Sequence, residues 1–414
     1  MSRRILIRNA RLLDARWDAP IPSGDVLIED GVIREISHRP LTAGDGMVID
    51  LGRRTLMPGL IDAHVHCVAT SVDLGRNALL PHTQVALSAA QILKGMLDRG
   101  FTTVRDAGGA DWSLAQAVET GLIAGPRLFI SGRALSQTGG HGDFRGRQAG
   151  GGQGCLCCQS LGNIARICDG VDAVRAAARD ELRKGAHQVK VMASGGVASP
   201  TDPIDGVQYS QDELRAVVDE ARSANTYVMA HAYTGRAITR AVESGVRTIE
   251  HGNLIDADAA RIVRERGAFV VPTLVTYDAI ARRGAALGFP EASIAKLDDV
   301  RHAGLGAIDM LRSLGVKMGF GTDLLGDLHG EQNREFTLRA EVLPARDIIA
   351  SATVVNAEIL GAGGKLGVLE VGAHADLIGV SGDPLEDITV LSRPDETLAL
   401  IMRGGRIIKN ECSG

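Results

Sequence analysis

Histidine and aspartate residues close several short apolar segments of this sequence. His64 and His66 end the first of these segments and stand two positions apart. Because the side chains of a strand alternate between its two faces, both imidazoles would point to the same side. His231, His251 and Asp323 end three further apolar segments. Imidazole and carboxylate groups are zinc ligands, and a carboxylate can also accept a proton from attacking water. The pattern predicts a metal centre in which Asp323 is also the general base.

Each of these signals has a plainer interpretation when it is taken alone. A histidine pair with this spacing can be part of a packed core. A single histidine at a strand end can be a hydrogen-bonded surface residue. Asp323 can be the N-cap of the helix that follows it, because aspartate is a favoured cap. The metal hypothesis therefore depends on all of these residues lying at one end of the fold.

Lys190 lies within the apolar segment Val189-Lys190-Val191-Met192. A buried ammonium is costly unless it has a partner or a lowered pKa, and as a cation it would repel metal ions. As a carbamate formed with CO2, the same side chain would be an anion able to bridge two metals. A Schiff-base lysine is the alternative. The metal-binding character of the other residues favours the carbamate.

The elements that must position these residues are short strands alternating with helices. We predict strands over 60–64, 102–106, 127–131, 188–192, 228–231, 248–251, 269–272 and 317–321. We predict helices over 171–185, 210–225, 257–267 and 292–315. This alternation is typical of βαβ units, so the fold class is α/β, as a (β/α)8 TIM barrel with catalytic residues at the carboxyl ends of its strands. An open doubly wound sheet is the alternative, but no G-x-G-x-x-G sequence follows an early strand.

Both ends of the chain have the pattern of strands and turns, including a predicted hairpin at Asp30-Gly31 and a turn at Gly404-Gly405. We therefore predict a small β-sandwich-like domain built from residues 1–57 and 357–414, with the barrel over residues 58–356. A barrel with such an appendage suits a chain of 414 residues.

The composition argues against several classes of protein. A net charge of −5 and 3% aromatic residues do not suit a nucleic-acid surface. The sequence shows neither the apolar run of a secretory signal nor that of a membrane span, so we expect a cytoplasmic protein. Six cysteines are too few for a disulfide scaffold. The cluster Cys155, Cys157 and Cys158 follows a glycine-rich stretch and fits loop packing better than a zinc site.

Taken together, the chemical residues resemble those of the binuclear members of the amidohydrolase superfamily. The resemblance spans almost the whole chain and is carried by His64, His66, Lys190, His231, His251 and Asp323, in this order. It implies that the first two histidines and Asp323 hold one divalent metal ion, and that the last two histidines hold a second. It also implies that carboxylated Lys190 bridges the two ions. Zinc is the metal that we expect.

Finer motifs resemble the prolidase-like dipeptidases and the relatives that release a C-terminal lysine or arginine. The matching stretches are 138–143, 190–196 and 231–234. In that branch, the histidine of the G-H-G-D loop and the tyrosine near the fifth-strand histidine bind the substrate's free carboxylate or its scissile carbonyl. The corresponding residues are His141 and Tyr233. A loop-anchoring histidine and a packed tyrosine are the alternatives.

The expected function is metal-dependent hydrolysis of an amide bond, with an Xaa-Pro dipeptide as the expected substrate. Asp323 would take a proton from water and pass it to the leaving nitrogen, while Tyr233 or His141 holds the developing negative charge. The alternatives are a carboxypeptidase acting on Xaa-Lys/Arg or N-acyl amino acids, an imidazolonepropionase-like cyclic-amide hydrolase, and a non-catalytic barrel. Asp202, Asp205 and Glu331 are acidic residues that could line a pocket for a basic side chain. We expect a homo-oligomer without nucleic-acid or membrane partners.

Overall fold

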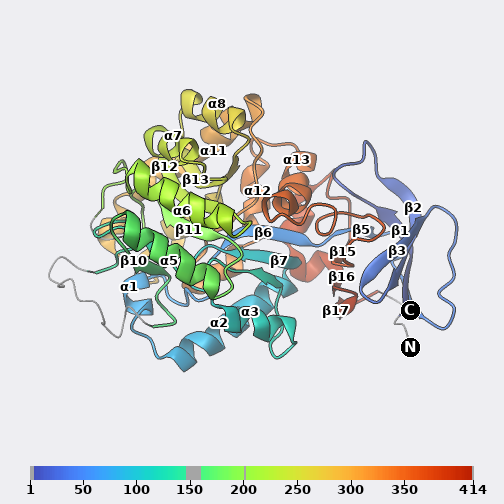
Figure 1. Cartoon of the computed structure of the whole chain (residues 1–414). Coiled ribbons are helices and arrows are strands. Elements are labelled where there is room, and N and C mark those ends of the chain that lie inside the picture. The colour runs from blue at the N-terminus through green and yellow to red at the C-terminus, as the bar shows by residue number, and fades with distance from the viewer. Residues whose placement is uncertain (1–3, 146–159, 200–201, 413–414) are drawn as a thin grey trace. The chain divides into compact units, whose positions relative to one another are not determined.

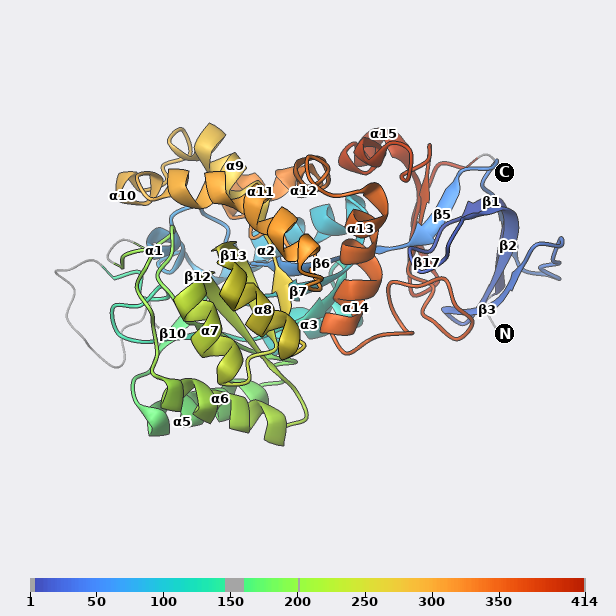
Figure 2. The same cartoon turned by 90° about the horizontal axis from the view of Figure 1, so that it is seen from above.

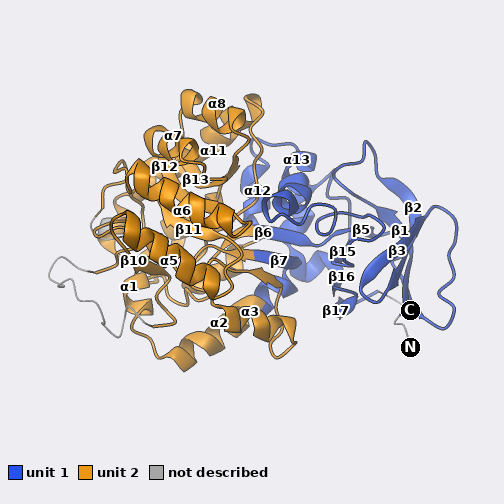
Figure 3. Cartoon of the chain, viewed as in Figure 1, with its two compact units in different colours: residues 1–62, 94–104, 333–414 blue, residues 63–93, 105–332 orange. Residues whose placement is uncertain are grey.

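Parallel strands and helices alternate through the middle of the chain in this computed structural model, which describes residues 4–145, 160–199 and 202–412. The chain divides into unit 1, residues 1–62, 94–104 and 333–414, and unit 2, residues 63–93 and 105–332 (Figure 3). The cluster Cys155, Cys157 and Cys158 lies outside the described residues.

The larger sheet of unit 2 has six strands, and all of its neighbouring strands are parallel. In spatial order these strands are β10 (Ala165–Ile167), β9 (Ala134–Ser136), β11 (Val189–Met192), β12 (Val228–Thr234), β13 (Thr248–Leu254) and β14 (Phe269–Val271). The register places Met192 opposite His231, and Ala232 opposite His251. The carboxyl ends of β11, β12 and β13 are thereby brought together.

A second sheet has three strands, in the order β6 (Leu60–Val65), β7 (Phe101–Asp106) and β8 (Arg127–Phe129). The first two of these strands begin in unit 1 and end in unit 2. The structure thus confirms the α/β class and the parallel strands, but its strand pairing gives two sheets and not one closed ring.

The prediction of an eighth strand over residues 317–321 is wrong, because the structure has no regular strand there. Only Met318 bridges a neighbour, Val270. The segment still bonds on two sides: Gly319 N donates to Val270 O at 2.8 Å, and Ala63 N donates to Phe320 O at 2.8 Å. Two glycines flank Phe320, and glycine within a strand weakens it. A positive φ of 53° at Asp323 then ends the extended course.

Helices cover the six-stranded sheet. Its buried core consists mainly of small and branched residues, such as Val191 and Ala230 on the strands and Ala177, Val217 and Ile238 on the helices. Figure 1 shows α5 and α6 packed side by side, and Figure 2 shows α7 beside β12 and β13, with α8 next to α7. The described helices of unit 2 are α1 (Leu74–Asn77), α3 (Trp112–Glu119), α5 (Val171–Arg183), α6 (Gln211–Ser223), α7 (Gly235–Glu243), α8 (Ala257–Glu265), α9 (Leu274–Ala279), η1 (Ile280–Gly284), α10 (Glu291–Ile294), α11 (Leu297–Ser313) and η2 (Gly326–Glu331). The helix α2 (His82–Asp98) runs from unit 2 into unit 1.

The four predicted helices are found, with the last one divided into α10 and α11. Ser210 caps α6 through a capping box with Glu213, as its sequence pattern predicts.

Unit 1 contains an eight-stranded sheet built from both ends of the chain. Its order is β17 (Arg406–Asn410), β16 (Leu398–Arg403), β15 (Leu377–Val380), β5 (Thr55–Pro58), β1 (Arg4–Leu12), β2 (Ile21–Glu29) and β3 (Val32–Ser37), with β4 (Met47–Asp50) paired to β1. The early and late strands meet where β5 pairs antiparallel with β15. Asp30 and Gly31 form the predicted hairpin turn with φ of 49° and 80°.

The remaining helices of unit 1 are short: α12 (Arg334–Arg339), α13 (Ala345–Ala350), η3 (Ser351–Val355), α14 (Asn356–Ile359), η4 (Ile388–Ser392) and α15 (Pro394–Thr397). Among the helices in the described part of the chain, none has the length and apolarity needed to cross a bilayer.

Candidate active site

All six predicted metal ligands line a single cavity in unit 2. The described residues that line it are His64, His66, Leu74, His141, Phe144, Ile164, Lys190, Met192, Ala198, His231, His251, Asp323 and Leu325. The ligand candidates come from the carboxyl ends of β6, β11, β12 and β13 and from the segment after residue 321. The cavity therefore forms where the strand ends meet, as expected for an active site of this architecture.

Asp323 is the centre of the ligand cluster. Its Oδ1 lies 3.2 Å from His66 Nε2 and 3.4 Å from His64 Nε2. Its Oδ2 lies 3.9 Å from His251 Nδ1. Donor atoms of His64, His251 and Asp323 fall within 4.8 Å of one another, close enough to share one ion. The H-x-H spacing thus brings both imidazoles to one carboxylate, as strand alternation predicts.

Hydrogen bonds to acceptors fix which imidazole nitrogen faces the ligand cluster. His66 Nδ1 lies 3.0 Å from Gly108 O, and His64 Nδ1 lies 2.7 Å from Glu250 Oε2. A carbonyl or an ionised carboxylate can only accept, so both Nδ1 atoms carry a proton, and the Nε2 atoms are the ones that face Asp323. His231 has the opposite arrangement, because its Nε2 lies 3.0 Å from Gly195 O and the lone pair falls on Nδ1. The donor set of imidazoles and one carboxylate suits zinc.

Burial and neighbouring charges shift the ionisation of these groups. Burial lowers the pKa of His231 and of His251 well below the usual histidine value, so both are neutral. Burial alone would raise the pKa of Asp323, but the imidazoles, His64 above all, outweigh it and hold that pKa well below its usual range. Burial lowers the pKa of Lys190 to about 8, against the opposing effect of Glu250. A neutral amine is the form that reacts with CO2.

A fully buried ion pair lies behind His64. Arg105 and Glu250 are both inaccessible to solvent, and Arg105 Nη2 lies 3.0 Å from each carboxylate oxygen. Arg105 Nε also donates to Ala63 O at 2.6 Å, and Thr248 Oγ1 donates to Glu250 Oε1 at 2.6 Å. Burial opposes ionisation of Glu250, but Arg105 and His64 hold its pKa at about 2. Glu250 is therefore an ionised acceptor that keeps His64 in one orientation.

The backbone is unusual at two of the ligand candidates. His251 has a φ of 72° and Asp323 has a φ of 53°. Both residues therefore lie in the left-handed region, which residues other than glycine rarely adopt. Such conformations cost about 1–3 kcal/mol and cluster at functional sites. At His251 the turn also explains why two adjacent residues, Glu250 and His251, both serve the ligand cluster despite the alternation of a strand.

His141 lies against the histidine cluster. Its ring stacks on His231 with a centroid distance of 4.1 Å, and its Nδ1 lies 2.7 Å from Ser199 Oγ. The predicted position of His141 at the site is therefore found.

Tyr233 is not among the residues that line the cavity. It packs edge-on against His231 at a centroid distance of 4.8 Å, and Tyr277 Oη donates a hydrogen bond to its hydroxyl at 2.9 Å. Tyr277 is joined in this way to the residues at the end of β12.

Three acidic residues that could have lined a pocket for a basic side chain lie elsewhere. Asp202 is buried and accepts from Gly196 N and Gln208 Nε2, each at 3.1 Å. Glu331 pairs with Arg282 and Arg283, and Asp205 is exposed. None of the three belongs to the described lining of the cavity. The hypothesis of an acidic pocket for a basic side chain is therefore wrong for these residues.

Part of the cavity lining is an apolar wall. Its residues are Leu74, Phe144, Ile164, Met192, Ala198 and Leu325. A ligand here would bring a polar group to the histidines and an apolar group to this wall, which is the usual design of a small-molecule site.

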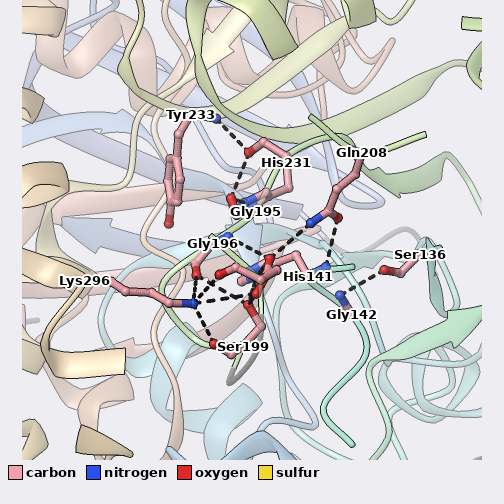
Figure 4. A network of polar contacts seen from close by, with 12 residues as sticks. Ser136, His141, Gly142, Gly195, Gly196, Ser199, Gln208, His231, Tyr233 and Lys296 are labelled. Carbon is pink, nitrogen blue, oxygen red and sulfur yellow. Dashed lines mark hydrogen bonds and ion pairs between the residues drawn. The ribbon is translucent and has the colours of Figure 1, made fainter. Parts of the chain in front are cut away.

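Sequence reasoning missed several residues that support the site. Arg105 could have been found, because an arginine inside an apolar strand raises the same question as Lys190. Glu250 shares a strand face with Thr248, so alternation also points to it. Ser199, Tyr277 and Lys296 lie outside the strands, and no periodic pattern identifies them. Figure 4 shows the network around His141, in which Ser199 and Lys296 take part.

Comparison with known proteins now adds to this geometry. The model of the Amidohydrolase family matches residues 55–408. The chain belongs to the amidohydrolase family. It is 32% identical to the ochratoxinase of Aspergillus niger over 374 residues, which cover 86% of this chain and 75% of that protein.

Solved structures of high similarity include the crystal structure of a prolidase complexed with N-methylphosphonate-L-proline. It has a TM-score of 0.97 and 53% identity, and the match covers 98% of this chain and 100% of that one. The crystal structure of a Xaa-Pro dipeptidase with bound methionine has a TM-score of 0.87 and 31% identity, with 98% and 100% covered. This amidohydrolase is a hydrolase of amide or other C–N bonds, as predicted. Its family generally uses divalent metal ions, and the cluster of His64, His251 and Asp323 has donors suited to one.

Proposed function

We propose that this amidohydrolase is a prolidase-type dipeptidase that cleaves Xaa-Pro dipeptides. The observation that carries the proposal is the cavity itself, which sets histidines, Lys190 and Asp323 against an apolar wall without a described acidic residue other than Asp323. A proline ring suits the apolar wall, whereas a lysine or arginine side chain would bring an uncompensated charge to it. The likeness to a prolidase whose structure holds a proline-containing ligand supports the same assignment.

We further propose that the site holds two zinc ions. One would be bound by His64, His66 and Asp323, and the other by His231 and His251, with Lys190 as a bridging carbamate. The orientations of the imidazole rings and the lowered pKa of Lys190 support this set. When bound, such ions polarise a carbonyl and lower the pKa of water toward about 7.

The side chains of the protein would carry out proton transfer, substrate binding and exclusion of water. Asp323, which is ionised and faces the cavity, takes the proton of the attacking water and returns it to the leaving nitrogen. That return matters for a prolyl substrate, because its leaving group is a secondary amine. His141 lines the cavity and would bind the substrate's free carboxylate. Tyr233, which packs against His231 and is not among the described lining residues, would support the charge on the carbonyl oxygen. The apolar wall restricts water around the reacting bond.

A second candidate is hydrolysis of other N-acyl amino acids, which the likeness to an ochratoxinase favours. The apolar wall would suit an aromatic or aliphatic amino acid as well as proline. An imidazolonepropionase-like activity would use one metal and no lysine ligand. One zinc ion per chain, with no change in metal content after Lys190→Ala, would support that alternative.

We also propose that a (β/α)8 barrel is formed by β6, β7, β8, β11, β12, β13 and β14, with the 317–323 segment in the eighth place. The backbone bonds of this segment to Val270 on one side and to Ala63 and His64 on the other support closure. The domain bounds at residues 57 and 357, the homo-oligomer, the absence of nucleic-acid and membrane partners, and the cytoplasmic location stay predictions.

The test is a hydrolysis screen of the zinc-loaded enzyme. Xaa-Pro, Xaa-Lys, Xaa-Arg and Xaa-Phe dipeptides are compared with N-acetyl amino acids by kcat/KM. We expect Xaa-Pro to be the best substrate class and Xaa-Lys and Xaa-Arg to be the poorest. A preference for basic residues would contradict the proposal, and a preference for N-acetylphenylalanine would favour the second candidate.

A further inference from the structure

The segment that follows β11 forms one side of the site and is held by a distant lysine. It begins with Ser194, which bridges Val207 in antiparallel fashion, and Gly195 N donates to Gly206 O at 2.9 Å. Lys296, at the start of α11, reaches this segment from a different part of the chain (Figure 4).

Lys296 places its ammonium in a ring of backbone carbonyls. Nζ donates to Gly196 O at 3.1 Å, Ser199 O at 2.9 Å and Asp202 O at 2.6 Å. An ammonium has three N–H donors, so each one has an acceptor on the same segment. The lysine side chain is only 19% exposed, so these contacts are largely shielded from water. The three hydrogen bonds of the ammonium therefore all go to this segment, and Nζ also lies 3.7 Å from Asp202 Oδ1.

Asp202 holds the same segment from within. Its carboxylate accepts from Gly196 N and Gln208 Nε2, each at 3.1 Å, and from the hydroxyl of Ser199. Gln208 Oε1 in turn accepts from His141 N at 2.9 Å. The segment is thereby fixed at both its carbonyl and its amide groups.

The segment contacts two of the imidazoles of the site. Gly195 O accepts from His231 Nε2 at 3.0 Å, which leaves His231 Nδ1 as the metal donor. Ser199 Oγ lies 2.7 Å from His141 Nδ1 and sets the direction of that ring. The packing is close, because a Cβ on Gly196 would lie 2.1 Å from His141 Cε1. A small shift of the segment would therefore displace both imidazoles.

We propose that Lys296 is a positioning residue of the site, which sets the orientations of His141 and His231 by holding residues 194–199 and Asp202. The part that concerns substrate binding by His141 rests on the proposed function. The competing interpretation is that Lys296 only attaches α11 to its surroundings. In that case its loss would lower the stability of the protein without a specific effect on the site.

The test uses Lys296→Met, Ser199→Ala and the double variant, with Ala-Pro as substrate at saturating zinc. Lys184→Met is the matched control, because Lys184 is 41% exposed and pairs with Asp180 away from the cavity. For Lys296→Met we expect a rise in KM of about 10-fold or more, since misplaced binding groups cost up to about 100-fold in rate. For Ser199→Ala we expect a rise in KM of about 5-fold, the effect of one hydrogen bond. In the double variant, KM should not exceed that of Lys296→Met alone.

Two further measurements do not depend on any substrate. Zinc affinity of the metal-free protein should fall about 10-fold in Lys296→Met, because His231 loses its oriented acceptor, and should not change in Ser199→Ala. Backbone amide exchange in peptides covering residues 194–199 and 202–208 should become faster in Lys296→Met, while peptides from α5 stay unchanged. If Ala-Pro is not cleaved by the wild-type enzyme, the proposed function fails, and these two measurements still decide the role of Lys296.

The inference is overturned if Lys296→Met matches Lys184→Met in KM, zinc affinity and amide exchange. It is also overturned if the effects of Lys296→Met and Ser199→Ala on KM multiply in the double variant. Should Lys296→Met fail to fold, Lys296→Arg replaces it in the same cycle. A planar guanidinium keeps the charge but cannot direct its donors at three carbonyls around one point, so the same pattern with smaller changes is expected.

Discussion

Two sides of the cavity are built by different physical means. On the strand side, His64 is backed by the ion pair of Arg105 and Glu250, and both charged side chains have no solvent exposure. On the loop side, His141 is backed by Ser199 and by a segment that the partly accessible Lys296 holds through backbone carbonyls and an ion pair with Asp202. The strand side orients His64, a proposed metal ligand, whereas the loop side orients His141, a proposed substrate contact, together with His231. The two sides therefore differ in the solvent exposure of the charged groups that support them.

The two sides should differ in how much stability the protein loses when one interaction partner is removed. A buried ion pair that loses one partner leaves a charge without compensation, which costs about 3–5 kcal/mol. A hydrogen bond near the surface contributes only about 0.5–1.5 kcal/mol. We therefore expect changes on the strand side to affect stability and metal binding together, and changes on the loop side to affect substrate and metal binding with a smaller loss of stability.

The largest effect is expected for Asp323→Asn. The amide cannot take a proton, so kcat/KM should fall by about 100- to 10,000-fold, the usual contribution of a general base. Circular dichroism and the thermal midpoint check that the fold is retained. A loss of less than 10-fold would remove Asp323 from the proton-transfer role and leave it only the role of a ligand.

Arg105→Met should lower the free energy of unfolding by about 3–5 kcal/mol, because Glu250 is left buried and charged. Denaturant unfolding of the metal-free protein measures this. Arg339→Met is the control, since Arg339 and Glu335 form another pair without solvent exposure, 2.7 Å apart and in unit 1. Both variants should be destabilised, but only Arg105→Met should lower zinc affinity. Equal zinc affinities would show that the Arg105 pair is not part of the metal support.

Glu250→Gln should lower zinc affinity by about 10- to 100-fold, the usual effect of removing an acceptor behind a ligand histidine. The neutral amide can still accept from His64 Nδ1, but it no longer stabilises the proton there. Competition with a chelating dye measures the affinity. An unchanged affinity would contradict the role of the strand side in the comparison.

The smallest effect is expected for Tyr277→Phe, which removes the hydrogen bond to Tyr233 and keeps the buried ring. We expect kcat/KM to fall about 5-fold, as for the loss of about 1 kcal/mol. In the background of Tyr233→Phe, the same change should have no further effect. Independent, multiplying losses would mean that Tyr277 acts by some route other than Tyr233.

The sequence allows prediction of the strand side better than of the loop side. His64 and His66 follow from strand alternation, and Lys190 is conspicuous because it is charged within an apolar strand. The register of β11, β12 and β13 then brings the strand ends together without further information. Asp323 was placed correctly although its segment is not a regular strand, because a turn can present a side chain where a strand would end.

The loop side could not be predicted, for a physical reason. Lys296 and Ser199 are far apart in the chain and lie on irregular segments, where no period relates position to direction. Lys296 contacts the backbone carbonyl of Ser199. Because every residue has such a carbonyl, the residue types do not reveal this contact. The acidic residues show the same limit, because Asp202 and Glu331 have suitable types but are engaged elsewhere.

The shared sheet of unit 1 has a consequence for synthesis of the chain. Leu56 of β5 pairs with Gly379 of β15, so one edge of β5 has no partner until the chain has been synthesised through β15. An open edge is a template for association with other chains. This edge of β5 therefore stays unpaired until the nascent chain has passed Leu377. Chaperones that shield strand edges should matter most before that point.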